Sequence, residues 1–236
     1  MPAPSKSGKI SEQNTALKTN MYISNLKLPL EARAMGGSSH NNDIEIFNTE
    51  TDELIECIED KSNNSSRTDY GQFRIAYDEN QGWYQATGTK KPELVELFTF
   101  LKPMLDEKLP TNVPSGPKLT FADAVSFWNI VEPGRTKSLK SGDILEFQIE
   151  PAVIDRYYRA KGNGYLKIGE HIYSLKENDS LPLLSSMVKN ARALFRLKYH
   201  KANHHSYTIA LRINCNGNEE TVFDSAITEI LSSLLT

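Results

Sequence analysis

LFRLKYHKANHHSYTIALRIN, residues 194–214, decides the fold class expected for this chain. Side chains of a β-strand alternate between its two faces, and here one face is apolar while the other is polar or cationic. With a five-residue turn at Lys201–His205, every apolar side chain meets another: Tyr199 faces Tyr207, Leu197 faces Ile209, and Phe195 faces Leu211. The stretch therefore predicts an antiparallel hairpin with one buried face.

Short strands bounded by turn residues recur on both sides of this hairpin. We expect strands at 21–30, 44–47, 54–58, 144–150 and 153–159, and hairpins at 72–87 and 165–175. We expect helices near 92–108, 121–130, 181–192 and 224–235. Thr120 is the expected N-cap of the second of these helices, with Asp123 in its first turn. The fold class expected is α+β, made mainly of antiparallel β hairpins. A barrel of the oligonucleotide-binding type (OB-like) with inserted helices is compatible with this pattern.

Domain organisation is expected to be simple. Residues 1–20 have few apolar side chains and no period, which predicts a flexible N-terminal arm. Residues 21–236 are expected to form a single globular domain. The strongest break signal is LPTNVPSGPK, residues 109–118, where we place any internal boundary.

The two cysteines, Cys57 and Cys215, are too few for a disulfide framework or a four-cysteine zinc site. No apolar run approaches the roughly 20 residues that a membrane-spanning helix needs. The N-terminus lacks the apolar middle of a secretory signal. Together these features favour a reduced, cytoplasmic protein without a membrane partner.

The charge of the chain is unevenly distributed. The net charge is −3. Residues 1–150 carry 16 basic and 22 acidic side chains, a net −6, whereas residues 151–236 carry 11 and 8, a net +3. Between Asp179 and Glu219 there is no acidic residue. The basic C-terminal part therefore favours an anionic partner.

Catalytic and metal-binding motifs are mostly absent from the sequence; Ser186–Lys189 fits S-x-x-K, but its companion motifs are missing. It contains no phosphate-binding GxxxxGK[ST] or GxGxxG, no HExxH, no GxSxG and no paired CxxC. His200, His204 and His205 are interpreted as turn residues in preference to metal ligands. The carboxylates of residues 43–60 are interpreted as a solvated or partner-facing acidic edge. We therefore expect no enzyme activity, no catalytic residue, no metal and no cofactor.

Cations and aromatic rings are interleaved in VIDRYYRAKGNGYLKIG, residues 153–169. Cations that follow phosphates, together with rings that stack on bases, are typical of proteins that bind single-stranded nucleic acid. A cationic strip on the 194–214 hairpin adds to this pattern, as do two aromatic residues of the 72–87 hairpin. The candidate nucleic-acid-binding residues are Arg156, Tyr157, Tyr158, Arg159, Lys161, Tyr165, Lys167, Arg196, Lys198, Arg212, Trp83 and Tyr84.

Three functions follow from these observations as hypotheses. The first is a non-enzymatic protein that binds single-stranded DNA or RNA with little sequence preference. The second is a structural or assembly protein, such as a viral or phage component, that forms a homo-oligomer through its acidic and basic faces. The third is an enzyme whose residues are scattered in the sequence, which a site of convergent titratable groups would favour.

Overall fold

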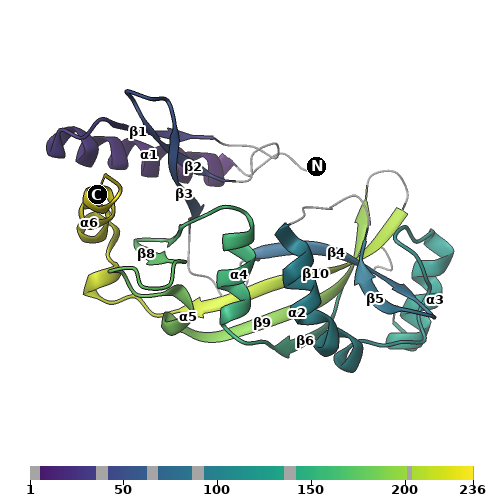
Figure 1. The fold of residues 1–236 in the computed structure, drawn as a ribbon. Helices are drawn as coiled ribbons and strands as arrows, with labels where there is room; N and C mark the ends of the chain where they lie inside the picture. The colour runs from purple at the N-terminus through teal and green to yellow at the C-terminus, as the bar shows by residue number, and fades with distance from the viewer. Residues whose placement is uncertain are drawn as a thin grey trace. The chain divides into compact units, whose positions relative to one another are not determined.

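The computed structural model describes residues 6–35, 42–62, 69–86, 93–135, 142–200 and 204–235. The chain divides into two compact units. Unit one comprises Met1–Thr68, Ile154–Lys189 and Asn214–Thr236, and unit two comprises Asp69–Val153 and Asn190–Ile213. Each unit contains one five-stranded sheet (Figure 1). None of the described helices is both long and apolar enough to cross a membrane.

The sheet of unit one has the strand order β1-β2-β3-β7-β8. Neighbouring strands are antiparallel except β3 and β7, which are parallel. The strands are β1 (Leu30–Ala34), β2 (Ile44–Asn48), β3 (Leu54–Lys61), β7 (Tyr165–Ile168) and β8 (His171–Ser174). The helices of this part of the chain are α1 (Lys6–Leu26), α4 (Ala152–Ala160), α5 (Leu184–Met187), the 3-10 turn η1 (Glu219–Thr221) and α6 (Phe223–Ser233).

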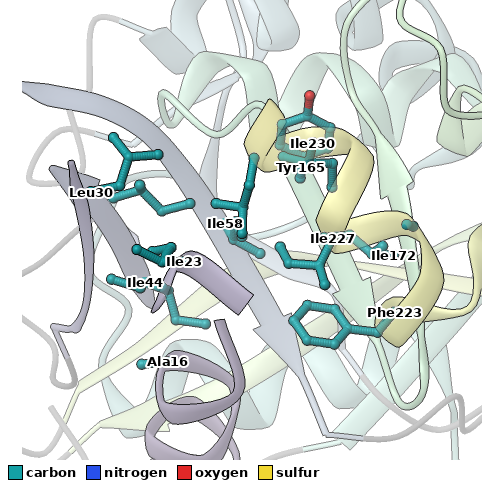
Figure 2. Close-up of a cluster of buried hydrophobic side chains, with 14 of the residues drawn as sticks. Ala16, Ile23, Leu30, Ile44, Ile58, Tyr165, Ile172, Phe223, Ile227 and Ile230 are labelled. Carbon is teal, nitrogen blue, oxygen red and sulfur yellow. The ribbon is translucent and has the colours of Figure 1, made fainter. Parts of the chain in front are cut away.

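The apolar core of unit one joins the two terminal helices to the sheet. Figure 2 shows Ala16 and Ile23 of α1 and Ile227 of α6 gathered around Ile44 and Ile58 of the strands. All five side chains are buried. Segments from both ends of the chain are therefore required to complete one core, because the sheet alone leaves this apolar face uncovered.

The sheet of unit two has the strand order β5-β4-β10-β9-β6. The pairs β5–β4, β4–β10 and β9–β6 are antiparallel. Its strands are β4 (Gly71–Asp78), β5 (Gly82–Gln85), β6 (Gly142–Gln148), β9 (Val188–His200) and β10 (His204–Cys215), with helices α2 (Glu93–Lys108) and α3 (Phe121–Val131). One face carries an aromatic core in which Trp83 and Phe127 contact both Phe195 and Tyr207. The predicted N-cap is confirmed: Thr120 and Asp123 form a capping box at α3.

The α+β class and the dominance of antiparallel sheet are confirmed. The long hairpin expected around residues 194–214 forms from β9 and β10, although part of its turn lies outside the described residues. Each sheet ends in two edge strands, and neither closes into a barrel within the described chain, so the OB-like prediction is not confirmed. The expected single domain is divided into two units, and residues 109–118 lie inside unit two.

The predicted flexible arm is a helix from Lys6 onward, while residues 1–5 lie outside the described residues. α1 extends to Leu26, so it also replaces most of the strand expected at 21–30. Its buried stripe includes Thr15, Ala16, Thr19 and Ile23, which recur at helical spacing. Because this stripe mixes threonine and alanine with a single isoleucine, the sequence shows no apolar period.

Two further expectations about secondary structure were wrong. Residues 153–159, expected as a strand, belong to helix α4. The buried residues Val153, Ile154, Tyr157 and Tyr158 have helical spacing, and Pro151 precedes the helix, where proline is favoured. The helix expected at 181–192 is only the single turn α5, and β9 begins directly after it. In both segments tertiary interactions outweigh local propensity: α4 packs through its apolar face, and β9 pairs with its neighbouring strands.

Candidate functional site

Charged side chains converge where β2 begins and β3 ends. Asp43 directly precedes β2, and Glu59 and Lys61 lie near the end of β3. Ile44 pairs with Ile58 across the two strands, so Asp43 and Glu59 are the next residues beyond that pair. Glu59 and Lys61 are two residues apart and point to the same face of the strand. The antiparallel register therefore brings both carboxylates and the ammonium group together.

Lys61 is shared by the two carboxylates. Its Nζ lies 2.6 Å from Glu59 Oε1 and 3.9 Å from Asp43 Oδ2. Glu59 receives a second ammonium group, because Lys161 Nζ donates to Glu59 Oε2 over 2.5 Å. Asp43 Oδ2 also accepts the backbone N–H of Asp60 over 2.9 Å, which fixes the orientation of its carboxylate. These four side chains, Asp43, Glu59, Lys61 and Lys161, are called the carboxylate–lysine cluster below.

Lys161 is brought to the cluster by the tertiary structure. It follows α4 in a tight turn that leads into β7, and β7 pairs in parallel with β3. The ammonium group also lies 5.4 Å from the ring centroid of Tyr158 and 6.0 Å from that of Tyr157. Such cation–π contacts help to hold a lysine that is largely removed from water. The residues of α4 therefore act as a support for Lys161.

The cluster is poor in water, and this shifts its protonation equilibria. The side chains of Glu59 and Lys161 are only 5% and 13% exposed. Burial opposes ionisation of Glu59, but Lys61 and Lys161 outweigh it and hold the pKa of Glu59 below its usual range. Burial raises the pKa of Asp43, and the negative charge of Glu59 adds to the effect. Perturbed groups in such a setting are typical of functional sites.

The two lysines respond in opposite directions. Burial disfavours the charged form of Lys61, but Glu59 and Asp43 outweigh it and raise its pKa. Burial lowers the pKa of Lys161, and the charge of Lys61 adds to this, although Glu59 opposes it. Lys61 therefore remains an ammonium ion at neutral pH. Lys161 releases its proton more readily than an ordinary lysine.

A fifth charged group approaches from α1. Glu12 is buried, and its pKa is raised first by burial and then by the charges of Asp43 and Asp60. α1 is held in register by Asp60, whose carboxylate accepts from Thr15 Oγ1 over 2.6 Å and from Ser11 Oγ over 3.1 Å. Asp60 therefore sets the position at which Glu12 meets the cluster.

The acidic residues of 43–60 were expected to be solvated or to face a partner, and this was wrong for three of them. Glu56, Glu59 and Asp60 are buried, because β3 lies inside the sheet. Glu56 forms an ion pair with Lys176. The spacing Glu59-x-Lys61, with Asp43 at the start of the preceding strand, was the available signal for a site. Glu12 gave no such signal, since its region had no recognisable period.

Most of the predicted stacking rings lie in cores. Tyr158 and Trp83 are fully buried, and Tyr157 and Tyr165 are nearly so. Tyr157 and Tyr158 contact each other edge to face, and the hydroxyl of Tyr165 donates to Asp179. A base cannot reach these rings while they remain packed. Tyr84 differs, because it is only half-buried.

The predicted cations are dispersed. Lys167 is buried and forms an ion pair with Asp60 over 3.5 Å, which contradicts its expected place on the surface. Arg156 and Arg159 are exposed on α4, where Arg159 pairs with Glu177. In unit two Asp69 pairs with both Arg196 and Arg212, while Lys198 Nζ donates to Gln72 Oε1. Arg74, which the sequence did not single out, lies on the same sheet.

The histidines and cysteines add no metal ligand set. His205 is buried in β10, so its interpretation as a turn residue was wrong. Cys57 and Cys215 are buried and form no disulfide. Among the described residues, no three histidine, cysteine, aspartate or glutamate side chains are grouped as a metal site. Comparison with protein-family models, curated proteins and solved structures gave no match to the chain.

Proposed function

We propose that this protein is a hydrolase of nucleic acid that cleaves phosphodiester bonds with the help of a divalent cation. The observation that carries the proposal is the carboxylate–lysine cluster, in which Lys61 Nζ lies 2.6 Å from Glu59 and 3.9 Å from Asp43. The cluster combines two carboxylates with two ammonium groups on adjacent elements. This is the scattered but convergent type of site that favours an enzyme.

Two carboxylates are sufficient for the cation proposed here. Mg²⁺ is usually bound through one or two carboxylates, while water and substrate phosphates complete its coordination shell. Asp43 and Glu59 would supply these ligands, since they lie beside each other at the start of β2 and the end of β3. When bound, such a cation polarises a phosphoryl oxygen and lowers the pKa of a bound water. Lys61 compensates the two carboxylates when no metal is present.

The lysines supply complementary chemistry. In phosphodiester hydrolysis water gives up a proton as it attacks phosphorus, the bond to the leaving oxygen breaks, and negative charge builds up on the phosphoryl and leaving oxygens until the leaving oxygen takes up a proton. Lys61, which stays charged, stabilises that charge. Lys161, whose pKa is lowered by burial, is suited to exchange a proton with the attacking water or the leaving oxygen. Glu12, with its raised pKa, is a second group that can hold a proton near the cluster.

The proposal is tested by incubating labelled single-stranded and duplex DNA and RNA with the protein in Mg²⁺, Mn²⁺ or EDTA. We expect cleavage with either metal, no cleavage in EDTA, and a loss of roughly 100-fold or more in Asp43→Asn. Glu31→Gln is the matched control, because this exposed carboxylate of the same unit pairs only at the surface. Asp43→Asn should remain folded, since amide and carboxylate have similar shapes.

Binding without cleavage is the competing function. It predicts that the folded protein retains nucleic acid in Mg²⁺ and Mn²⁺ but leaves every substrate intact. It also predicts that metal ions do not change the melting temperature. In contrast, a metal site at Asp43 and Glu59 predicts a rise in melting temperature with Mn²⁺ that Asp43→Asn removes. Absence of both cleavage and metal-dependent stabilisation would reject the hydrolase.

A further inference from the structure

The face of the unit-two sheet opposite the aromatic core is polar. Tyr84 pairs with Ala76 across β5 and β4, and Arg74 pairs with Thr208 across β4 and β10. Directly paired residues share a face, as do residues two apart along a strand. The hydrogen bonds of Lys198 and His200 place them on this face as well. The polar face is defined here by Gln72, Arg74, Tyr84, Arg196, Lys198, His200, Ser206, Thr208 and Arg212.

The cations of this face differ in how far carboxylates neutralise them. Asp69 is within 3.1 Å of both Arg196 and Arg212. In contrast, the contacts that the described residues give Arg74 and Lys198 are to a histidine and a glutamine. Burial lowers the pKa of Lys198, the charges of Arg196 and Arg74 lower it further, and the charge of Asp69 opposes them only in part. Among the described residues, the region around Arg74 and Lys198 is therefore electropositive.

Polar neighbours hold these two cations in place. Gln72 accepts from Lys198 over 2.8 Å, and its amide nitrogen lies 3.3 Å from Thr208 Oγ1. His200 Nδ1 lies 3.5 Å from Arg74, and Nε2 lies 2.7 Å from Ser206 Oγ. Burial lowers the pKa of His200 to about 4, with Arg74 contributing. The ring is therefore neutral at pH 7, and Arg74, which can only donate, faces its acceptor nitrogen.

We infer that the polar face binds the backbone of single-stranded nucleic acid, with Arg74 and Lys198 contacting phosphates and Tyr84 stacking on a base. The inference rests on the proposed function only for the type of polymer. Cations that follow phosphates and an accessible ring are the combination used for single strands. Tyr84 is the one predicted stacking residue that is half-buried on this face.

Binding is measured by fluorescence anisotropy with labelled dT20 and a duplex of equal length, in EDTA and over a range of salt concentrations. EDTA removes hydrolysis, so the outcome does not depend on the proposed activity. We expect Arg74→Ala/Lys198→Ala to weaken binding of dT20 and to flatten its salt dependence by about 1.4, at roughly 0.7 per lost phosphate contact. We expect Tyr84→Ala to weaken binding roughly 5- to 150-fold with the salt dependence unchanged.

Lys108→Ala is the control, because Lys108 is an exposed cation of the same unit that lies on α2, outside the polar face, and pairs with Glu107 over 2.5 Å. An equal effect of Lys108→Ala and of the double variant would overturn the inference. So would a wild type that binds the duplex as tightly as dT20, that fails to bind dT20 at low salt, or that binds polyglutamate equally well. Loss of cleavage with binding intact would reject only the proposed hydrolase.

Discussion

Asp60→Asn should loosen α1 from the sheet. The carboxylate of Asp60 is fully buried and accepts hydrogen bonds from Ser11 and Thr15 of α1. It also pairs with Lys167, whose side chain is 11% exposed. The asparagine keeps an oxygen that can accept from Thr15 but loses the charge. Lys167 would then be buried without its counter-charge, which costs about 3–5 kcal/mol in the free energy of unfolding.

The change is best followed by two measurements. For a chain of this size, about 3–5 kcal/mol corresponds to a fall of roughly 6–20 °C in melting temperature. Hydrogen exchange should show where the loss occurs, with protection falling first in α1 peptides. Thr15→Val removes one hydrogen bond to a charged acceptor and should cost about 1.5–3 kcal/mol. Hydrogen exchange also identifies which of the two units is affected.

Removing both charges provides the decisive comparison. Asp60→Leu/Lys167→Met eliminates the pair without leaving a buried ion, so this double variant should be more stable than Asp60→Asn. Glu31→Gln, which removes an exposed ion pair, should change stability by about 1 kcal/mol or less. If Asp60→Asn costs less than about 1 kcal/mol and α1 exchange is unchanged, the docking of α1 through Asp60 is refuted.

Three further predictions concern other parts of unit one. Burial raises the pKa of Asp155 to about 6; protonation therefore favours the folded state, and stability should fall by about 2–3 kcal/mol as pH rises from 4 to above 6. Urea titrations should show that Asp155→Asn flattens this dependence. Tyr158→Ala should cost about 3–5 kcal/mol through lost core packing, lowering the melting temperature while leaving the salt dependence of binding unchanged. Cys57→Ser/Cys215→Ser should leave cleavage and binding nearly unchanged in the assays above, because both thiols are buried, lie outside the carboxylate–lysine cluster and the polar face, and form no disulfide.

Local pattern was sufficient for much of the fold. The alternation in residues 194–214 gave the hairpin of β9 and β10, and the leucines of 92–108 gave α2. Thr120 and Asp123 marked the start of α3 because capping depends on neighbouring residues alone. Such features are determined within a few residues of the chain. They can therefore be predicted without knowledge of the tertiary structure.

Residue patterns that depend on their neighbours in space were misread. α1 buries threonine and alanine beside Ile23, so its inner face has no apolar signature. The tyrosines and β-branched residues of 153–159 favour a strand by propensity, yet they pack as one face of α4. The sequence also showed an excess of cations in the C-terminal part, but not that Asp69 neutralises Arg196 and Arg212.

The sequence by itself determined the α+β class, the antiparallel hairpins and the faces of individual strands, since these follow from periods of two or 3.6 residues. Only the tertiary structure brought Lys161 to Glu59, 102 positions away in the chain. It did so through the parallel pairing of β7 with β3, which no local pattern specifies. The carboxylate–lysine cluster exists because residues that are unremarkable in sequence share one poorly solvated space, where their charges must compensate each other.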